Sequence, residues 1–199
     1  MKRIVIAVLC LFAVSPSAAV ELGAPIPLAE HSMADVDGKR WSVGEVSGQK
    51  GTLVMFICVH CPWVQKWNAR IGDLGRGARA AGIGVIAVNA NDPKRVPQDG
   101  PDGMRRQIAT NGFEFPYVID NGSTLTRAYG AQRTPEVFLF DAKGALVYHG
   151  TVDDNADDVE DVEQHFLRDA IAAGAAGKQP DPRETKALGC NIKMYTGAD

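Results

Sequence analysis

The sequence predicts an α/β sandwich, in which helices flank a central mixed β-sheet. Two uninterrupted apolar segments, residues 52–57 and 83–90, have the composition of strands covered on both faces. A segment with helical spacing begins at Pro62 and separates them, and a hairpin pattern over residues 136–150 follows later. Buried strands that alternate with a helix and end in an antiparallel hairpin are typical of this fold class.

The start of the chain is expected to lie outside this domain. Residues 1–19 combine a positively charged N-terminal region, an apolar run and a cleavage region of small residues. We therefore expect a secretory signal peptide cleaved after Ala19. The apolar run is shorter than the roughly 20 residues that a bilayer span needs. We therefore expect a signal peptide over residues 1–19, one domain over residues 20–177 and an irregular tail over residues 178–199 that carries Cys190.

Charge and cysteine content narrow the classes of partner. Loss of Lys2 and Arg3 with the signal changes the formal net charge from −3 to −5, which gives no electrostatic reason for binding nucleic acid or an anionic membrane. No membrane insertion is expected after cleavage, and the location predicted is secreted or periplasmic. Cys10 leaves with the signal, so one CxxC pair and a third thiol remain.

The elements before and after the first buried strand can be assigned in order. Asp37 and Gly38 give the turn signal for an N-terminal β-hairpin over residues 32–43. Helical spacing after Pro62 predicts a helix, whose second half should be weakened by glycines. The apolar positions of this helix are Val64, Trp67, Ile71, Leu74 and Ala78, and its glycines are Gly72, Gly75 and Gly77.

The segment that follows the second strand is expected to be irregular, because residues 91–103 are rich in Pro, Gly and Asp. A helix should then run from about Met104 to Thr110, followed by a strand at 115–119. Ser123 is positioned to cap the short helix that comes next.

An acidic segment precedes the last predicted helix. Residues 153–163 contain seven acidic side chains and no Lys or Arg. We expect them to lie in a loop and in the first turn of a helix that runs to about Ala173, where negative charge is favourable. A calcium loop is disfavoured, because the spacing departs from the EF-hand pattern and its central glycine is missing.

The chemistry is expected at Cys58 and Cys61. Because a strand ends and a helix begins there, Cys58 should lie at the helix amino terminus, which stabilises a thiolate. Cys61 should lie one turn deeper and be more shielded, so that the motif offers an attacking and a resolving thiol. His60 would favour the thiolate further when protonated, or is simply an exposed turn residue.

Two other uses of the motif are open. A copper or zinc carrier could use Cys58 and Cys61 with His60 or Cys190, although a closed zinc site usually takes four ligands in two separated pairs. A structural disulfide is disfavoured, because so short a loop constrains the unfolded chain little. Pro135, directly before a predicted strand, marks the strand's start or a special turn, which includes a cis bond after Thr134.

Several motifs in this order resemble the peroxiredoxin-like, or redoxin, branch of the thioredoxin superfamily, whose relatives include alkyl hydroperoxide reductases and thiol-specific antioxidants. The resemblance implies a thioredoxin-like sandwich, with Cys58 as nucleophile, Cys61 as its partner and Pro135 as a substrate-facing cis-proline. It extends from about residue 28 to residue 193 and is carried by FICVHCPWV, VIAVNANDP, FPYVID, AYGAQRTPEVFLFD, VYHGTVDD and LGCNIK.

The sequence also departs from its relatives. Peroxiredoxins have a proline and a Thr or Ser seven and three residues before the peroxidatic cysteine, where this chain has Val54 and Cys58 before Cys61. Arg127 or Arg133 could supply the cation of a peroxide site, or form a surface salt bridge.

Thioredoxin has a buried aspartate six residues before its first active cysteine, and here Thr52 stands in that place. Glu136, just after Pro135, could take over its part in proton transfer, or face solvent as most glutamates do.

The predicted function is thiol-disulfide exchange at Cys58-x-x-Cys61 with a protein thiol or disulfide partner, and no cofactor is expected. The alternatives are a thiol-dependent peroxidase acting on a small peroxide, with antioxidant activity, and the metal carrier. Cys190 is predicted to form a transient or regulatory disulfide with the pair, or to pack as a small hydrophobic residue. The sequence predicts no oligomeric state.

Overall fold

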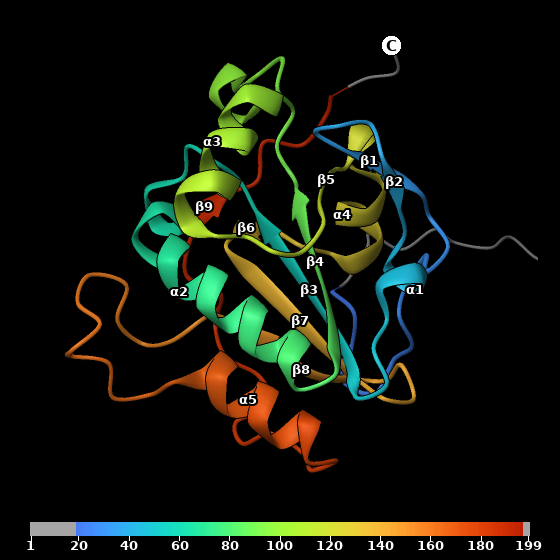
Figure 1. The fold of residues 1–199 in the computed structure, drawn as a ribbon, viewed down its shortest axis with the longest axis vertical. Coiled ribbons are helices and arrows are strands. Elements are labelled where there is room, and N and C mark those ends of the chain that lie inside the picture. Colours follow the sequence, from blue (N-terminus) through green and yellow to red (C-terminus); the bar gives the residue numbers. More distant parts are fainter. Residues whose placement is uncertain (1–18, 197–199) are drawn as a thin grey trace, which may run out of the picture.

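A computed structural model describes residues 19–196 of the protein (Figure 1). The predicted signal peptide therefore lies outside the described residues, apart from Ala19. In chain order the elements are β1 (Met33–Asp35), β2 (Arg40–Trp41), α1 (Val43–Val46), β3 (Gly51–Ile57), α2 (Pro62–Ala80), β4 (Ile83–Asn89), η1 (Pro97–Asp99), α3 (Pro101–Asn111), β5 (Tyr117–Ile119), η2 (Asn121–Ser123), α4 (Thr124–Tyr129), β6 (Arg133–Thr134), β7 (Glu136–Asp141), β8 (Leu146–Gly150), α5 (Phe166–Ala175) and β9 (Cys190–Asn191).

The predicted mixed sheet is confirmed. Its strands lie in the order β2-β1-β5-β4-β3-β7-β8, and a separate two-stranded sheet pairs β6 with β9. Strands β3, β4 and β5 are parallel to one another, whereas β7 and β8 form the predicted antiparallel hairpin beside β3. The predicted N-terminal hairpin, β1 with β2, extends the other edge through β5.

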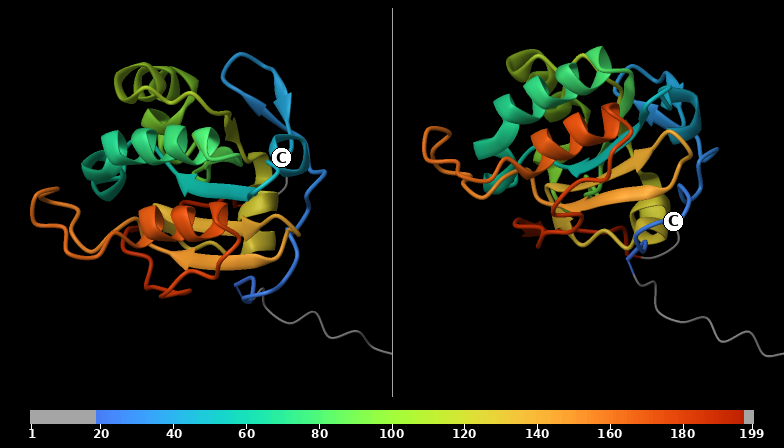
Figure 2. Two further views of the ribbon diagram at one scale, coloured as in Figure 1. Left: turned by 60° about the horizontal axis from the view of Figure 1, so that its bottom comes forward. Right: turned by 90° about the horizontal axis from the view of Figure 1, so that it is seen from below.

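Helices cover both faces of the sheet, as the two views in Figure 2 show. Alternate side chains of β3 point to opposite faces, so Met55 belongs to the core under α2 and α5, and Phe56 to the core under α1 and α4. Every residue of β3 is buried, as its uninterrupted apolar sequence predicts. Complete burial of such side chains contributes roughly 1.5–3 kcal/mol each.

Two of the glycines in α2 allow close packing, a role that their low helix propensity does not indicate. A Cβ at Gly75 would lie 2.2 Å from Cε1 of Phe115, and one at Gly72 would lie 2.3 Å from the main-chain oxygen of Asn111. At these two positions the missing side chain lets neighbouring segments pack against the helix. Gly77 has open space around it, so the expected weakening applies to that position.

The prediction of an irregular segment over residues 91–103 is wrong in its second half. Pro97 begins the short helix η1, and Pro101 begins α3, three residues before the predicted start at Met104. Proline is favourable at the first position of a helix, because the amide hydrogen that it lacks has no partner there. Asp99, between the two prolines, is completely buried.

The predicted cap of α4 is also wrong. Ser123 has a left-handed backbone and its side chain makes no capping hydrogen bond. Asp120 does this instead, because its carboxylate accepts from the amides of Leu125 at 3.1 Å and Thr126 at 2.7 Å. Ser123 Oγ accepts a 2.9 Å hydrogen bond from the amide of Tyr195 and so holds the C-terminal segment.

The acidic residues 153–163 lie entirely before α5, so their predicted place in its first turn is wrong. The loop is anchored to α2 through Asp153, which is buried. Its carboxylate accepts from Trp67 Nε1 at 2.7 Å and from Arg70 Nη1 at 2.6 Å. Asp153 thus attaches the acidic segment to a basic and an aromatic side chain of α2.

The C-terminal segment runs across the edge of the sheet at which β3 ends. Strand β9 pairs antiparallel with β6, so that Cys190 lies opposite Thr134. Beyond it, the amide of Lys193 donates to Asn91 Oδ1 at 2.6 Å. We call residues 190–195 the C-terminal strap. Within residues 19–196, no helix combines the length and apolar character that a bilayer span requires.

Candidate active site

Cys58 and Cys61 both follow β3, but their relation to the helix differs from the prediction. Helix α2 begins at Pro62, so Cys61 is its N-cap, whereas Cys58 lies before a turn that separates it from the helix. Both side chains are completely buried, at 0% exposure. Cys58, Cys61 and Cys190 are all free thiols.

Asp99 determines the shape of that turn. Its Oδ1 accepts hydrogen bonds from the main-chain amides of Val59 at 2.8 Å and His60 at 2.7 Å, while Oδ2 accepts from Asn91 Nδ2 at 2.7 Å. The amides after Cys58 therefore bind a buried carboxylate and not the sulfur. A negative charge thus lies beside the first cysteine of the motif.

Thr134 contacts both motif sulfurs from the opposite side. Cys58 Sγ lies 3.3 Å from Thr134 Oγ1, and Cys61 Sγ lies 3.0 Å from the main-chain oxygen of Thr134, to which the thiol can donate. The bond between Thr134 and Pro135 is cis, one of the two states allowed by the sequence. Pro135 is thereby placed beside the motif, as the family resemblance implied.

Cys190 packs against the same buried cluster as Cys58 and Cys61, and it pairs with Thr134, which contacts both motif sulfurs. Cys190 is the most exposed of the three, being only half-buried. The structure therefore brings the predicted third thiol to the motif.

The hydrogen bonds distribute charge unequally among these sulfurs. The hydrogen bond that Cys61 accepts from Cys58 lowers the pKa of Cys61, and burial opposes this effect. Further hydrogen bonds from Cys190, the Val64 amide and Thr134 lower it too. The same bond to Cys61 raises the pKa of Cys58, with burial and the charge of Asp99 acting in the same direction. The pair therefore loses its first proton more readily than an ordinary thiol and its second proton less readily.

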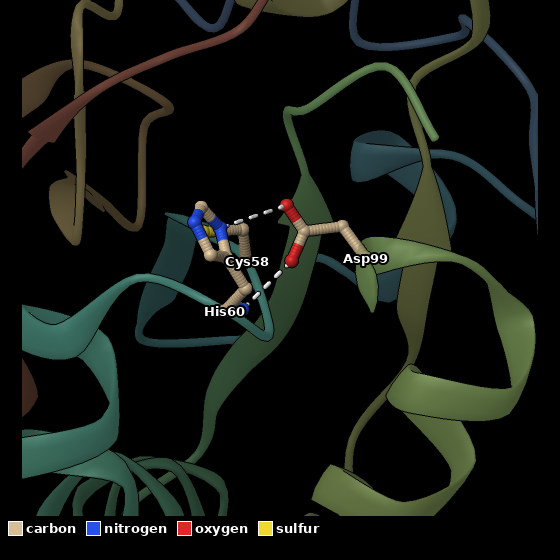
Figure 3. A group of neighbouring side chains, drawn as sticks. All are labelled: Cys58, His60 and Asp99. Carbon is tan, nitrogen blue, oxygen red and sulfur yellow. Dashed lines mark hydrogen bonds and ion pairs between the residues drawn. The ribbon is translucent and has the colours of Figure 1, made fainter. Parts of the chain in front are cut away.

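His60 extends from the turn toward solvent, and 42% of its side chain is exposed. Its Nδ1 lies 3.7 Å from Asp99 Oδ2, and Figure 3 shows the ring beside both Cys58 and the carboxylate. Protonated His60 would offset the charge of Asp99 near Cys58.

The same three residues form the group of possible metal ligands found within residues 19–196. Ligand atoms of Cys58, His60 and Asp99 lie within 4.8 Å of one another. This set has one sulfur, so it differs from the thiolate-rich site considered from the sequence. Both Asp99 oxygens already accept hydrogen bonds from Val59, His60 and Asn91, which accounts for the carboxylate without a metal.

Three other candidates from the sequence have structural contacts. Arg127 donates to Tyr195 O at 2.8 Å, and Arg133 donates to Gly189 O at 3.4 Å, so both hold the C-terminal segment. Glu136 is buried, so the expectation that it faces solvent is wrong. Its carboxylate accepts from two main-chain amides and lies 2.7 Å from His149 Nε2.

Thr52, which stands in the place of thioredoxin's buried aspartate, donates to Ser47 Oγ at 2.9 Å. The buried carboxylate beside the motif is instead Asp99, a residue that the sequence analysis missed. A second missed residue is Gln107 of α3, whose Nε2 donates to the main-chain oxygen of Cys58 at 3.2 Å.

Comparison with known proteins gives a consistent family. The model of the family described as Redoxin matches residues 21–165. The thiol-disulfide oxidoreductase ResA of Halalkalibacterium halodurans is 30% identical over 58% of this chain and 61% of its own length. ResA of Geobacillus thermodenitrificans is 25% identical, over 74% of this chain and 78% of its own. The match to the first of these relatives thus spans less than two thirds of that protein.

Solved structures extend the similarity over most of the chain. A hypothetical protein from Sinorhizobium meliloti 1021 is 31% identical with a TM-score of 0.82, covering 91% of this chain and 98% of that one. An uncharacterized conserved protein from Geobacillus kaustophilus is 29% identical with the same TM-score, covering 89% and 94%. Peroxidoxin BcpB from Mycobacterium tuberculosis, 15% identical with a TM-score of 0.51 over 79% and 96% of the two chains, shares the fold.

Proposed function

Since this chain belongs to the Redoxin family, we propose that it is a thiol-disulfide oxidoreductase that works through Cys58 and Cys61. The observation that carries this proposal is that both buried motif sulfurs contact Thr134, which places the two thiols together beside the amino end of α2. A thiolate is the form that attacks a disulfide, and a neighbouring thiol is what releases the product. The ResA relatives are named for the same activity.

In the reducing direction, the thiolate of the pair attacks one sulfur of a disulfide, and the other sulfur leaves as a thiolate. The second cysteine of the pair then loses its proton and attacks the first, which releases the second partner sulfur and leaves a Cys58–Cys61 disulfide. The motif loses two electrons and the partner disulfide gains them. In the opposite direction the same steps run in reverse and oxidise a partner dithiol.

Pro135 and His60 have supporting roles in this proposal. Thr134 contacts both sulfurs, and the ring of Pro135, the next residue, therefore forms part of the wall of the site. His60, when protonated, stabilises negative charge in the reduced motif and so makes the disulfide more oxidising. A His60→Gln variant should therefore have a lower reduction potential than the wild type.

We place the mature protein outside the cytoplasm, after cleavage behind Ala19, with protein thiols or disulfides as partners. This location is supported by the signal-like sequence of residues 1–19. Mass measurement of the exported protein would test it, because a retained leader would contradict the cleavage.

The activity is tested by insulin reduction and by equilibration of the protein with a glutathione buffer. The wild type should reduce insulin and show a single two-electron potential, whereas Cys58→Ser and Cys61→Ser should not complete the reaction. Val59→Ala is the matched control, since it alters the motif without removing a sulfur. A wild-type protein that neither reduces insulin nor equilibrates with glutathione would contradict the proposal.

A thiol-dependent peroxidase is a second candidate, favoured by one observation. The Thr134 hydroxyl lies 3.3 Å from the Cys58 sulfur, which places a hydroxyl beside the motif although it comes from a different element than in peroxiredoxins. The thiolate of the pair would attack one peroxide oxygen and become a sulfenic acid, while the O–O bond breaks and the other oxygen leaves as an alkoxide or hydroxide that takes up a proton. The second thiol would then condense with the sulfenic acid to form the disulfide and release water. Peroxide consumption by the reduced protein, faster than by Cys61→Ser, would support this candidate.

A further inference from the structure

The two motif sulfurs are closed off from solvent, and the C-terminal strap is part of the cover. Cys58 and Cys61 have 0% exposure. Gly189, next to the strap, packs so closely that a Cβ there would lie 2.3 Å from the main-chain oxygen of Thr134. A protein disulfide therefore cannot reach either motif sulfur while the strap is in place.

The strap is firmly attached, so it is not a loose cover. Its main chain bonds to Gln132 and to Asp92, through Ile192 N at 3.0 Å and Lys193 O at 2.8 Å. Side chains of the domain bind it as well. They are Asn91, which accepts from Lys193 N at 2.6 Å, Arg95, which donates to Met194 O at 2.8 Å, and Ser123, which accepts from Tyr195 N at 2.9 Å.

Cys190 connects the closed motif to the surface. It lies opposite Thr134 in the β6–β9 pair, and the main-chain oxygen of Thr134 lies 3.0 Å from the Cys61 sulfur. Cys190 also packs against the cluster that contains Cys61, and of these two thiols only Cys190 is partly exposed. A disulfide typically needs Cα atoms about 4.4–6.8 Å apart, and the shared contact with Thr134 favours such an approach of Cys61 and Cys190.

We propose that Cys190 is the thiol that exchanges with the partner, and that Cys61 forms a disulfide in turn with Cys58 inside the protein and with Cys190 at its surface. This inference rests on the proposed thiol-disulfide exchange and changes one step of it, because Cys190 and not a motif sulfur meets the partner. The partner is a protein segment with an accessible cysteine, which meets Cys190 and never enters the motif.

The route conserves atoms and electrons. In the reducing direction, the Cys190 thiolate attacks a partner disulfide and releases one partner thiolate. The Cys61 thiolate then attacks the Cys190 sulfur and releases the second partner thiolate, which gives a Cys61–Cys190 disulfide. Finally Cys58, after losing its proton, attacks Cys61 and frees Cys190, so the buried pair ends oxidised by two electrons.

The pKa values of these sulfurs favour the oxidising direction of this route. The lowered pKa of Cys61 makes its sulfur a good leaving group when a partner thiolate attacks the Cys190 sulfur of a Cys61–Cys190 disulfide. Burial, together with the neighbouring Cys61, raises the pKa of Cys190 to about 11. Attack by Cys190 on a partner disulfide should therefore accelerate as the pH rises toward that value.

The first test locates the mixed disulfide. Full-length mature Cys61→Ser protein, reduced and then treated with oxidised glutathione, should carry glutathione on Cys190, because the residue that would resolve this adduct is missing. Peptide mass mapping under non-reducing conditions measures the position. Glutathione on Cys58 with Cys190 free would overturn the inference.

The second test separates the route from the activity. Cys190→Ser should slow insulin reduction about tenfold or more, while the small oxidant diamide still forms its Cys58–Cys61 disulfide. Asn191→Ala, an exposed change in the same strand, should reduce insulin at the wild-type rate. If Cys190→Ser matches the wild type, the route is wrong and the proposed function remains. If the wild type itself reduces no insulin, the proposed function fails.

Discussion

Oδ1 of Asp99 accepts a 2.7 Å hydrogen bond from the main-chain amide of His60, and so a buried carboxylate holds the turn between the two motif cysteines. Asp99 comes from the segment after β4, far from the motif in sequence. Its charge is one reason why the pKa of Cys58 is raised.

Asp99→Asn should lower the pKa of Cys58, because the substitution removes a negative charge beside that sulfur. Ultraviolet absorbance of the thiolate, followed as the pH of the reduced protein is raised in a Cys190→Ser background, measures the Cys58 deprotonation without a contribution from Cys190. Asp102→Asn is the matched control, since that carboxylate is 88% exposed on α3 and should leave the titration unchanged. A Cys58 deprotonation that stays in place in Asp99→Asn would contradict the assigned role.

The stability of the reduced protein should depend on pH through Cys61. The pKa of Cys61 is lowered in the folded state relative to the ordinary thiol value of 9.0. Its contribution to the free energy of unfolding is therefore complete above pH 9.0 and is lost as the pH falls through the lowered value. The raised pKa of Cys58 acts with the opposite sign, but only as the pH rises above 9.0. Between the lowered value and 9.0, the free energy of unfolding should therefore rise with pH.

Urea denaturation under reducing conditions measures this slope, and Cys61→Ser should lack it. A slope of equal size in the variant would show that other groups cause the pH dependence.

Two alanine substitutions in α2 should have opposite effects on stability. Gly75→Ala places a Cβ 2.2 Å from a carbon of Phe115 and should destabilise the protein by about 1–3 kcal/mol. Gly77→Ala meets open space and should stabilise it by up to about 1 kcal/mol through helix propensity. Thermal or chemical denaturation of the two variants compares them directly, and destabilisation by both would refute this distinction.

Asp153→Ala should cost about 3 kcal/mol of unfolding free energy, because it leaves the buried Trp67 Nε1 and the guanidinium of Arg70 without their carboxylate. Asp161→Ala, in the same acidic segment but exposed, should change stability by less than about 0.5 kcal/mol. Equal losses in the two variants would mean that the net charge of the segment matters more than the anchor.

The sequence identifies the sheet and the motif because their signals are local. Uninterrupted apolar strands such as β3 and β4 are recognisable from composition alone, and the spacing of apolar residues identifies α2. The hairpin turn at Asp37 and Gly38 is equally local. These elements form the part of the fold that positions Cys58 and Cys61.

The surroundings of the motif depend on contacts between segments that are distant in sequence, and local sequence patterns do not predict such contacts. Asp99 lay in a segment expected to be irregular, and Ser123 looked like a better cap than Asp120. One topological signal could have found Asp99. The carboxyl ends of adjacent parallel strands meet at one edge of a sheet, so residues that follow β4 lie near those that follow β3.

The pairing of β6 with β9 also bears on how the protein acquires its redox centre during folding. Cys190 and Thr134 are distant in sequence, so their contact carries a cost in loop-closure entropy during folding. We expect a chain that has built its core but not yet paired these strands to expose its thiols to oxidants in the surroundings. Closure of this small sheet would then protect the thiols as the protein matures.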